Sequence, residues 1–357
     1  MKTALKNLWM PLLFIWTLSG CCIHQWPEQE IIEPNDDLVP VRLCLHYEPD
    51  FWLWEHLYDP KTGEIVEAYP DEAVDEQHPG TTYRYSGQCD HGTMRYLLRF
   101  YKPGSADTYT KEVTFTRNVN GGYDCDTLLY LTPGGYDVTV WSDLTETSDS
   151  DPFYDASDFL SVNLQLDPYH ACTDYRDAYR GIQQLVVMPD PEAGDIQEAV
   201  INMRRPMAKY EFVTTDLSEF LESETTRRQL PTRATAEDYI VKMVYVNYLP
   251  SAYSAIDDRL VDSSTGVSFP SSLTVTGDSE ASMGFDFVMI NDIPNATVAV
   301  QVQVYDMEGQ QVAVSRVIPV PLRRNHHTLL RGAFLTVGGS GGVYIDPTYD
   351  GDYNLFY

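Results

Sequence analysis

Short stretches of this chain alternate strictly between apolar and polar residues. The clearest example is residues 297–306, TVAVQVQVYD, and another is residues 39–47, VPVRLCLHY. Successive side chains of a β-strand point to opposite faces, so a period of two predicts a strand with one buried face and one exposed face. In the first example the predicted buried residues are Val298, Val300, Val302 and Val304, and the exposed ones are Ala299, Gln301 and Gln303.

Similar strand patterns recur along the chain, and turn motifs such as KPGS, VNGG and TPGG separate several of them. Many short strands with such turns predict an all-β protein, a sandwich or a barrel, and not alternating β and α units. One segment carries a helix signal: in DLSEFLES, Asp216 stands at an N-cap position and Glu219 at the capping-box position. The remaining predicted strands are residues 94–102, 109–117, 126–132, 136–143, 210–216, 237–250, 283–290, 310–320 and 328–337.

The length of 357 residues favours two domains, each large enough for its own core. The segment PDPEAG at residues 189–194 is the strongest candidate boundary. We therefore expect an N-terminal β-sandwich at residues 39–190 and a C-terminal β-sandwich at residues 195–357. Residues 48–92, rich in acids, prolines and aromatics, are interpreted as a long insertion in the first domain.

The N-terminus has the pattern of a lipoprotein signal peptide. Lys2 and Lys6 precede an apolar run, and Leu18-Ser19-Gly20-Cys21 follows it and resembles a bacterial lipobox. The run is shorter than the roughly 20 residues of a transmembrane helix. We expect residues 1–20 to be removed, Cys21 to carry the lipid and residues 21–38 to act as a tether. The alternative is an ordinary signal peptide followed by a chance cysteine.

The formal charge of −29 argues against nucleic-acid binding, because so acidic a chain is repelled by phosphate backbones. Beyond Cys21 and its neighbour Cys22, the cysteines fall in the N-terminal half. In an exported protein they can form disulfides with three alternative pairings, or they can stay buried thiols. These four candidates are Cys44, Cys89, Cys125 and Cys172.

No sequence motif for catalysis or metal binding stands out. H-E-x-x-H and Walker-type motifs do not occur, and the acidic run TETSDSDPFYDASD lacks the spacing of an EF-hand. We therefore expect no enzyme activity, no metal and no cofactor. Trp52, Trp54 and Tyr58 in DFWLWEHLY are candidate sugar-stacking aromatics, and the alternative is a hydrophobic flap over the sandwich.

Several phrases together resemble the fimbrillin-like lipoproteins of the Bacteroidales, including the FimB-type fimbrial anchor subunits. They run from residue 133 to residue 336 and comprise PGGYDVTVWSDL, FYDASDF, DYRDAYRG, RRPMAKYEFVTTDL and VPLRRNHHTLLRGAFLT. The resemblance implies two tandem Greek-key β-sandwiches of transthyretin-like topology. It also implies a place in type V pili, with other fimbrillin-like subunits as partners and assembly by β-strand donation.

Within that family, cleavage after an arginine removes the lipidated strand of stalk subunits, whereas an anchor keeps it. Residues 22–41 contain no lysine or arginine, and Arg42 lies inside a predicted strand. This favours an anchor or accessory subunit, attached to the outer membrane by lipid and exposed at the cell surface. The alternative is a surface adhesin that binds glycans or host proteins. The C-terminal segment, which ends in DYNLFY, is either a core strand or a donor strand.

Overall fold

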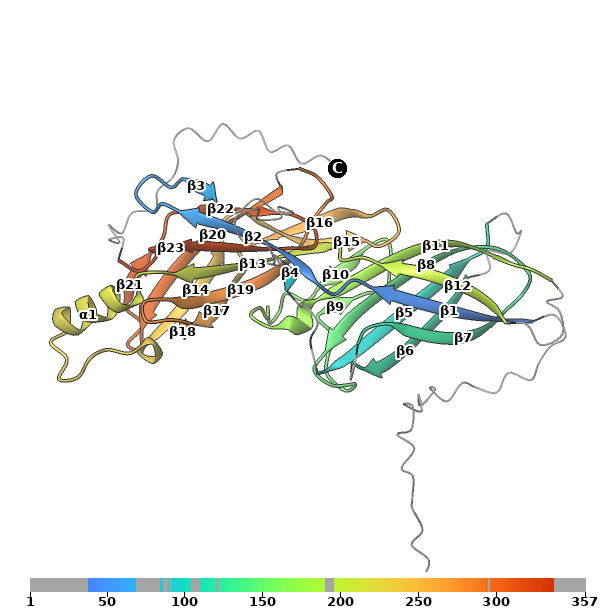
Figure 1. Cartoon of the computed structure of the whole chain (residues 1–357), viewed down its shortest axis with the longest axis horizontal. Coiled ribbons are helices and arrows are strands. Elements are labelled where there is room, and N and C mark those ends of the chain that lie inside the picture. The colour runs from blue at the N-terminus through green and yellow to red at the C-terminus, as the bar shows by residue number, and fades with distance from the viewer. Residues whose placement is uncertain are drawn as a thin grey trace, which may run out of the picture. The chain divides into compact units, whose positions relative to one another are not determined.

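The structure is a computed structural model, and it describes residues 38–68, 84–85, 89, 91–103, 110–119, 122–189, 196–294 and 296–336. The described residues all belong to one compact unit. Within the described residues the chain is almost entirely β-strand, as the alternation in the sequence predicts, with a single α-helix (Figure 1).

Two sheets pack around the first core. Sheet I has the order β12-β1-β7, and sheet II has the order β11-β8-β5-β6. Their inward side chains form a cluster of buried aliphatic and aromatic residues from both sheets. The strands of sheet I are β1 (Val39–Tyr47), β7 (Cys125–Leu131) and β12 (Gln197–Met203); those of sheet II are β5 (Thr93–Tyr101), β6 (Thr110–Asn118), β8 (Gly134–Thr145) and β11 (Ala178–Val187).

Two further sheets enclose the second core. Sheet III has the order β18-β19-β13-β23-β2-β3, with β4 also paired to β2, and sheet IV has the order β17-β14-β20-β21, with β22 also paired to β20. The strands of sheet III are β2 (Phe51–Tyr58), β3 (Ile65–Glu67), β4 (Arg84–Tyr85), β13 (Met207–Thr214), β18 (Thr274–Val275), β19 (Ala281–Met289) and β23 (His326–Gly332). Those of sheet IV are β14 (Tyr239–Tyr245), β17 (Ser268–Ser272), β20 (Ala296–Asp306), β21 (Gln311–Val314) and β22 (Ile318–Leu322).

A small fifth sheet joins strands from both halves of the chain in the order β16-β15-β10-β9. Its strands are β9 (Tyr154–Asp155), β10 (Val162–Leu164), β15 (Tyr248–Ser254) and β16 (Arg259–Thr265), and two short 3₁₀ helices, η1 (Asp174–Arg176) and η2 (Ala236–Asp238), complete the described elements together with α1. The predicted strand at residues 237–250 is therefore two strands, β14 and β15, joined by a short turn.

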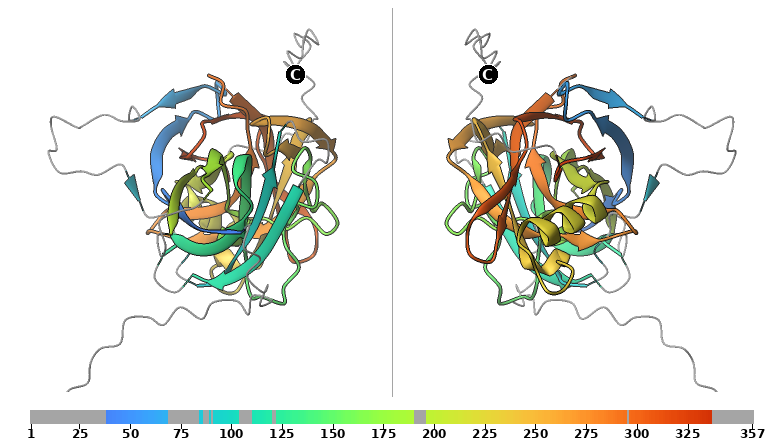
Figure 2. Two further views of the ribbon diagram at one scale, coloured as in Figure 1. Left: turned by 90° about the vertical axis from the view of Figure 1, so that its right-hand side faces the viewer. Right: turned by 90° about the vertical axis from the view of Figure 1, so that its left-hand side faces the viewer.

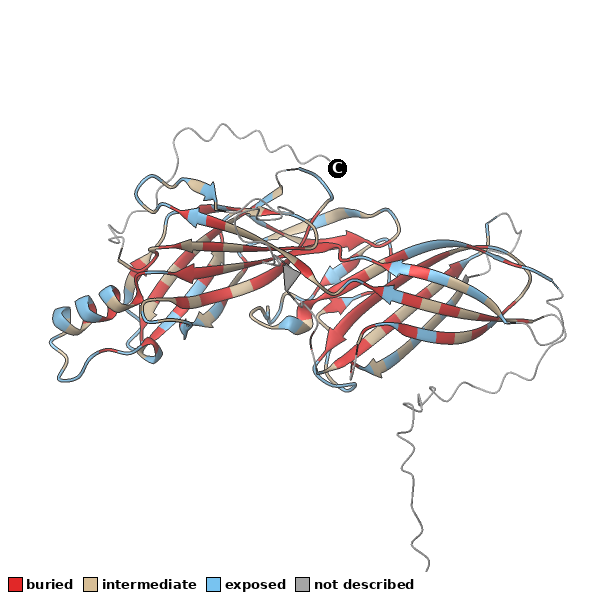
Figure 3. Cartoon of the chain, viewed as in Figure 1, coloured by how far each residue is buried: buried red, intermediate tan, exposed pale blue. Residues whose placement is uncertain are grey.

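The alternation seen in the sequence is realised as burial. In β20 the four valines are buried, and the residues between them are partly exposed (Figure 3). The helix α1 (Leu217–Arg227) buries Leu217, Phe220 and Leu221 on one face and lies at one end of the second sandwich (Figure 2). Asp216 is its N-cap residue as predicted, but its carboxylate does not cap the helix. It accepts hydrogen bonds from Thr336 and Leu335 instead.

The strand pairing departs from the expected division of the chain at two places. Strand β12, expected in the C-terminal domain, pairs in parallel with β1 in sheet I. Strand β2, expected in an insertion at residues 48–92, pairs in parallel with β23 in sheet III. Both differences have one cause: β1 continues into β2, and β12 into β13, through connections of three residues that pass from one core to the other. A boundary at residues 189–196 therefore assigns β12 to the second domain, although β12 pairs with β1 in sheet I of the first sandwich.

Candidate functional site

Strand β1 occupies the centre of sheet I. It pairs with β12 in parallel on one side and with β7 in antiparallel on the other. Its inward residues Val39, Val41, Leu43 and Leu45 are all buried, as the sequence pattern predicts. A central strand forms main-chain hydrogen bonds on both edges and packs one full row of side chains into the core. Strand β1 therefore fills a strand-shaped groove between β7 and β12.

The last residue of β1, Tyr47, sits in an aromatic pocket. Its ring lies edge-on to the rings of Tyr179, Tyr123 and Tyr96, with centroid distances of 5.0, 6.1 and 6.5 Å. The Tyr47 hydroxyl and the Ser142 hydroxyl lie 2.9 Å apart in a hydrogen bond. Burial raises the pKa of Tyr47 well above its ordinary value, so this hydroxyl stays protonated.

Beyond Tyr47 the two parallel strands separate. In sheet I, β1 lies beside β12, whereas in sheet III their continuations β2 and β13 both pair with β23, which lies between them. The separation takes place at the connection Glu48–Asp50, at Arg205 and at Asn325, which immediately precedes β23. We call these residues the fork.

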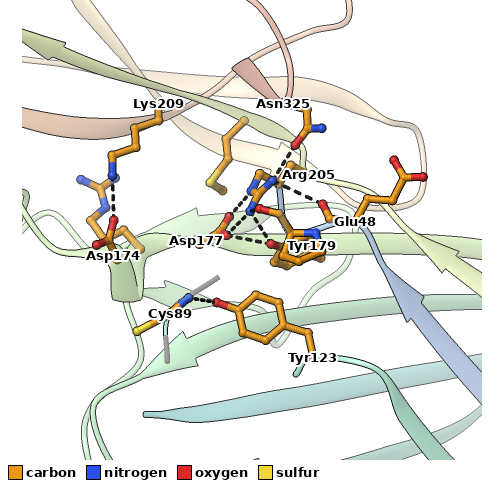
Figure 4. A network of polar contacts seen from close by, with 12 residues as sticks. Glu48, Cys89, Tyr123, Asp174, Asp177, Tyr179, Arg205, Lys209 and Asn325 are labelled. Carbon is orange, nitrogen blue, oxygen red and sulfur yellow. Dashed lines mark hydrogen bonds and ion pairs between the residues drawn. The ribbon is translucent and has the colours of Figure 1, made fainter. Parts of the chain in front are cut away.

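Arg205 is buried at the centre of the fork (Figure 4). Its guanidinium donates to both carboxylate oxygens of Asp177, at 2.7 and 2.8 Å, and to the Tyr179 hydroxyl. It also donates to the side-chain oxygen of Asn325. The guanidinium carbon stands 3.7 Å from the centroid of the Phe51 ring, within cation–π range.

The same guanidinium also holds the main chain between β1 and β2. It donates to the carbonyl oxygens of Glu48 and Asp50, at 3.5 and 3.4 Å, and to that of Pro49. These carbonyls follow the last residue pair of the β1–β12 ladder, at Tyr47. The seven acceptors of Arg205 outnumber the five N–H groups of a guanidinium, so some N–H groups are shared between two acceptors. An ammonium, with three donors, would serve fewer of them.

The charge of Arg205 is matched by the carboxylate of Asp177, which lies beside the fork. Burial on its own lowers the pKa of an arginine, but the Asp177 carboxylate and Tyr179 outweigh it and raise the pKa of Arg205. Burial raises the pKa of Tyr179 further above its ordinary value. The cluster therefore pairs one buried cation with one buried carboxylate. If the two groups separated while the surrounding strands stayed in place, both charges would remain buried and out of contact with water.

A comparison with protein families matches residues 68–356 to a family of unknown function, DUF6562. The chain belongs to this family. No curated protein matches it.

Three solved structures illustrate what the chain is similar to. The fimbrial anchor protein Mfa2 from Porphyromonas gingivalis is 12% identical, with 78% of this chain and 83% of that chain covered and a TM-score of 0.38. A candidate cell adhesion protein from Bacteroides eggerthii is 12% identical, with coverages of 87% and 92% and a TM-score of 0.42. A candidate adhesin from Bacteroides ovatus is 12% identical, with coverages of 85% and 88% and a TM-score of 0.39. Fimbrial and adhesion proteins of the Bacteroidales are the group that the sequence phrases resemble.

The candidate sugar-stacking aromatics lie in strand β2. Tyr58 is buried and stacks on Phe334, with ring centroids 5.2 Å apart, so it is not available to a ligand. Trp52 and Trp54 are half-buried, and the Arg323 guanidinium covers Trp54 at 5.6 Å from its ring centroid. The structure places these three residues within a paired strand of sheet III, and not in a flap.

The four cysteines in the described part of the chain are free thiols in the structure. Cys89 and Cys125 are buried, and Cys44 and Cys172 are half-buried. Burial raises the pKa of Cys44, Cys125 and Cys172, which disfavours the reactive thiolate. Cys21, the tether and the C-terminal segment lie outside the described residues. No helix among the described residues is long and apolar enough to cross a membrane.

The sequence pattern located β1 but not the fork. Arg205 lies in the phrase RRPMAKY, where two arginines precede a proline between two apolar strands. A basic residue between two apolar strands is the local signal that could have indicated a buried arginine. Its partners are 28 residues away at Asp177 and 120 residues away at Asn325, and no local pattern connects them.

Proposed function

We propose that this chain is a lipid-anchored subunit of a type V pilus, at its base or as an accessory component, and that it keeps its own strand β1. The observation that carries the proposal is the central position of β1 in sheet I, with its inward residues buried from Val39 to Tyr47. A groove that accepts one extended strand with alternating apolar residues has the form used in β-strand donation.

Retention of β1 is supported by where the basic residues lie. The tether offers no lysine or arginine, and Arg42 is paired through its main chain to both β12 and β7. Its side chain forms an ion pair with Glu198 at 2.6 Å. A protease needs an extended, unpaired substrate segment, so a paired Arg42 is a poor cleavage site.

The proposal gives Cys21 the role of membrane anchor and gives the C-terminal segment, residues 344–357, the role of a donor strand. Tyr353, Leu355 and Tyr357 alternate in that segment. One lipid chain binds a membrane only marginally, and the several chains of a bacterial lipoprotein hold it stably. The protein is thereby placed at the outer membrane, with other fimbrillin-like subunits as partners and with no catalytic role.

The experiment is affinity isolation from the producing bacterium. A chain tagged in an exposed loop should recover other fimbrillin-like subunits from solubilised outer membranes. Deletion of residues 352–357 should abolish that recovery and leave the melting temperature unchanged. A fall of several degrees in the melting temperature would instead identify this segment as a core strand, since about 1 kcal/mol shifts a domain of this size by roughly 2–4 °C.

Two outcomes would contradict the proposal. Recovery of glycans or host proteins without any fimbrillin would identify a stand-alone adhesin. Unchanged membrane association of a Cys21→Ser variant after carbonate washing would remove the lipid anchor.

A further inference from the structure

The connection between β1 and β2 is held by a side chain that belongs to neither strand. Arg205 donates to the carbonyls of three consecutive residues, Glu48, Pro49 and Asp50. It reaches them from the β12–β13 connection, which is itself fixed on both sides. Arg204 exchanges two main-chain hydrogen bonds with Arg180, at 2.8 and 2.9 Å, and the Pro206 carbonyl accepts one from Ile290 at 3.1 Å.

The two ends of β1 are consequently held in different ways. At its first residue, Val39, the strand follows the tether. At its last residue, Tyr47, the strand enters the aromatic pocket and is followed directly by the connection that Arg205 holds. The Tyr47 amide also donates to the Asp124 carboxylate at 2.8 Å. Any opening of sheet I that begins at Val39 must therefore stop at the fork unless the guanidinium contacts break.

We propose that Arg205 is a latch that keeps β1 in its groove and so closes sheet I to strand donation by another subunit. The proposal rests on the pilus role proposed above and adds to it the regulation of the same groove. Leaving the groove requires the connection to move away from a buried guanidinium, and hydrogen bonds to a charged donor are stronger than those between neutral groups. A chain with a different residue at position 205 would have an exchangeable β1.

The latch makes a prediction about the isolated full-length protein. In the wild type, amide hydrogen exchange in β1 should be fastest near Val39 and slowest near Tyr47, because the contacts of the fork hold only the Tyr47 end. In an Arg205→Lys variant that gradient should disappear. Exchange at residues 45–47 should become at least about tenfold faster, which corresponds to about 1.4 kcal/mol. Exchange in β6 and β20, which contain no residue of the fork, should stay at the wild-type rate.

Arg95→Lys is the matched control. Arg95 also forms a two-bond pair with a buried aspartate, Asp143, at 2.8 and 2.6 Å, and also donates to a main-chain carbonyl, that of Tyr154. It lies in sheet II of the same sandwich and bonds to neither β1 nor the connection. If Arg95→Lys accelerates exchange at residues 45–47 as much as Arg205→Lys does, the effect is general destabilisation and the latch is refuted. An unchanged gradient in Arg205→Lys refutes it as well.

A milder variant covers the case in which Arg205→Lys does not fold. Asn325 adopts a positive φ of 59°, so Asn325→Gly keeps the backbone conformation and removes one guanidinium acceptor. It should accelerate exchange at residues 45–47 by a smaller factor than Arg205→Lys, and no acceleration at all would overturn the proposal.

A peptide experiment tests whether the released groove accepts a strand. A fluorescent peptide of residues 39–47, with Cys44 replaced by serine, should bind Arg205→Lys and not the wild type. Failure to bind a variant whose β1 exchanges rapidly would refute the claim that the latch controls strand entry. Both measurements use the purified chain alone, so they can fail while fimbrillins still co-purify with it. Equally, an absence of fimbrillin partners would refute the pilus role and leave the latch standing.

Discussion

The ring of Tyr47 stands 5.0 Å from that of Tyr179, centroid to centroid, in an edge-to-face arrangement. Tyr179 in turn accepts a hydrogen bond from Arg205 and donates one to Asp177 at 2.8 Å. The Tyr179 side chain therefore contacts both the last residue of β1 and Arg205 of the fork. The pocket that receives the last residue of the strand is part of the same cluster that holds the connection after it.

Truncating Tyr47 should destabilise the protein strongly. Tyr47→Ala removes a buried aromatic ring and should lower the free energy of unfolding by about 3–5 kcal/mol, and Tyr47→Phe by about 1–2 kcal/mol because the buried Ser142 hydroxyl loses its partner. Urea unfolding measures both. Tyr130→Ala, on an exposed face of β7, is the control and should change stability by less than about 1 kcal/mol. Equal effects of Tyr47→Ala and Tyr130→Ala would show that the pocket is not a packed site.

Closure of the first sandwich depends on Gly181 in β11. A Cβ atom at this position would lie 2.6 Å from Ile201 and from Met203 of β12. Gly181→Val should therefore destabilise the protein by about 1–3 kcal/mol or more through overpacking. Gly135→Val is the matched control in β8, because nothing lies within 4 Å of the Cβ built there. A Gly181→Val protein with the denaturant midpoint of Gly135→Val would show that the close approach of β11 to β12 does not require a glycine at position 181.

Acidification should destabilise the second sandwich through His327. Burial lowers the pKa of His327, and Glu211, 3.2 Å away, raises it only in part. Because the unfolded state binds the proton more readily, the stability due to neutral His327 is complete above its unfolded pKa of about 6.5 and is lost as pH falls below that value. The destabilisation caused by His327→Gln should thus shrink between pH 7.5 and pH 5.

The control for this titration is His170→Gln, at an exposed position. Its effect on the free energy of unfolding should be small at both pH values. A His327→Gln effect that stays constant from pH 7.5 to pH 5, measured by urea unfolding, would show that this histidine does not contribute to the pH dependence.

Cutting the chain between residues 190 and 195 should not separate the two cores. A C-terminal fragment from residue 195 lacks β2 and carries β12 without its partner β1. After cleavage at an inserted protease site, the two pieces should elute together in size-exclusion chromatography, and the isolated C-terminal piece should be unfolded by circular dichroism. A stable, monomeric fragment beginning near residue 195 would restore the domain boundary that the sequence suggested.

Local patterns in the sequence predict much of the fold but not its long-range pairing. The alternation in β1 and β20 directly identifies strands with a buried face, because burial and side-chain direction share a period of two. Strand β2 escaped prediction because its tryptophans, acids and flanking prolines obscure that period. The parallel pairs β1–β12 and β2–β23 join residues more than 150 positions apart, and periodicity carries no information about which strands become neighbours.

The candidate site shows the same limit. The tether without basic residues and the paired Arg42 were accessible from the sequence, because both are local properties. Arg205 was not, because an arginine is ordinarily a surface residue and only its distant partners make burial favourable.

The retention of β1 in assembled material is the central claim, and the N-terminus of the protein in cells tests it most directly. Mass spectrometry of the chain isolated from pilus-bearing cells should find Cys21 as the first residue, lipidated, with residues 22–42 still attached. The same N-terminus should be found in an arginine-protease-deficient strain. A chain that begins at residue 43, or after Lys61 or Arg84, would show that the lipidated strand is removed, and would contradict both the anchor role and the latch.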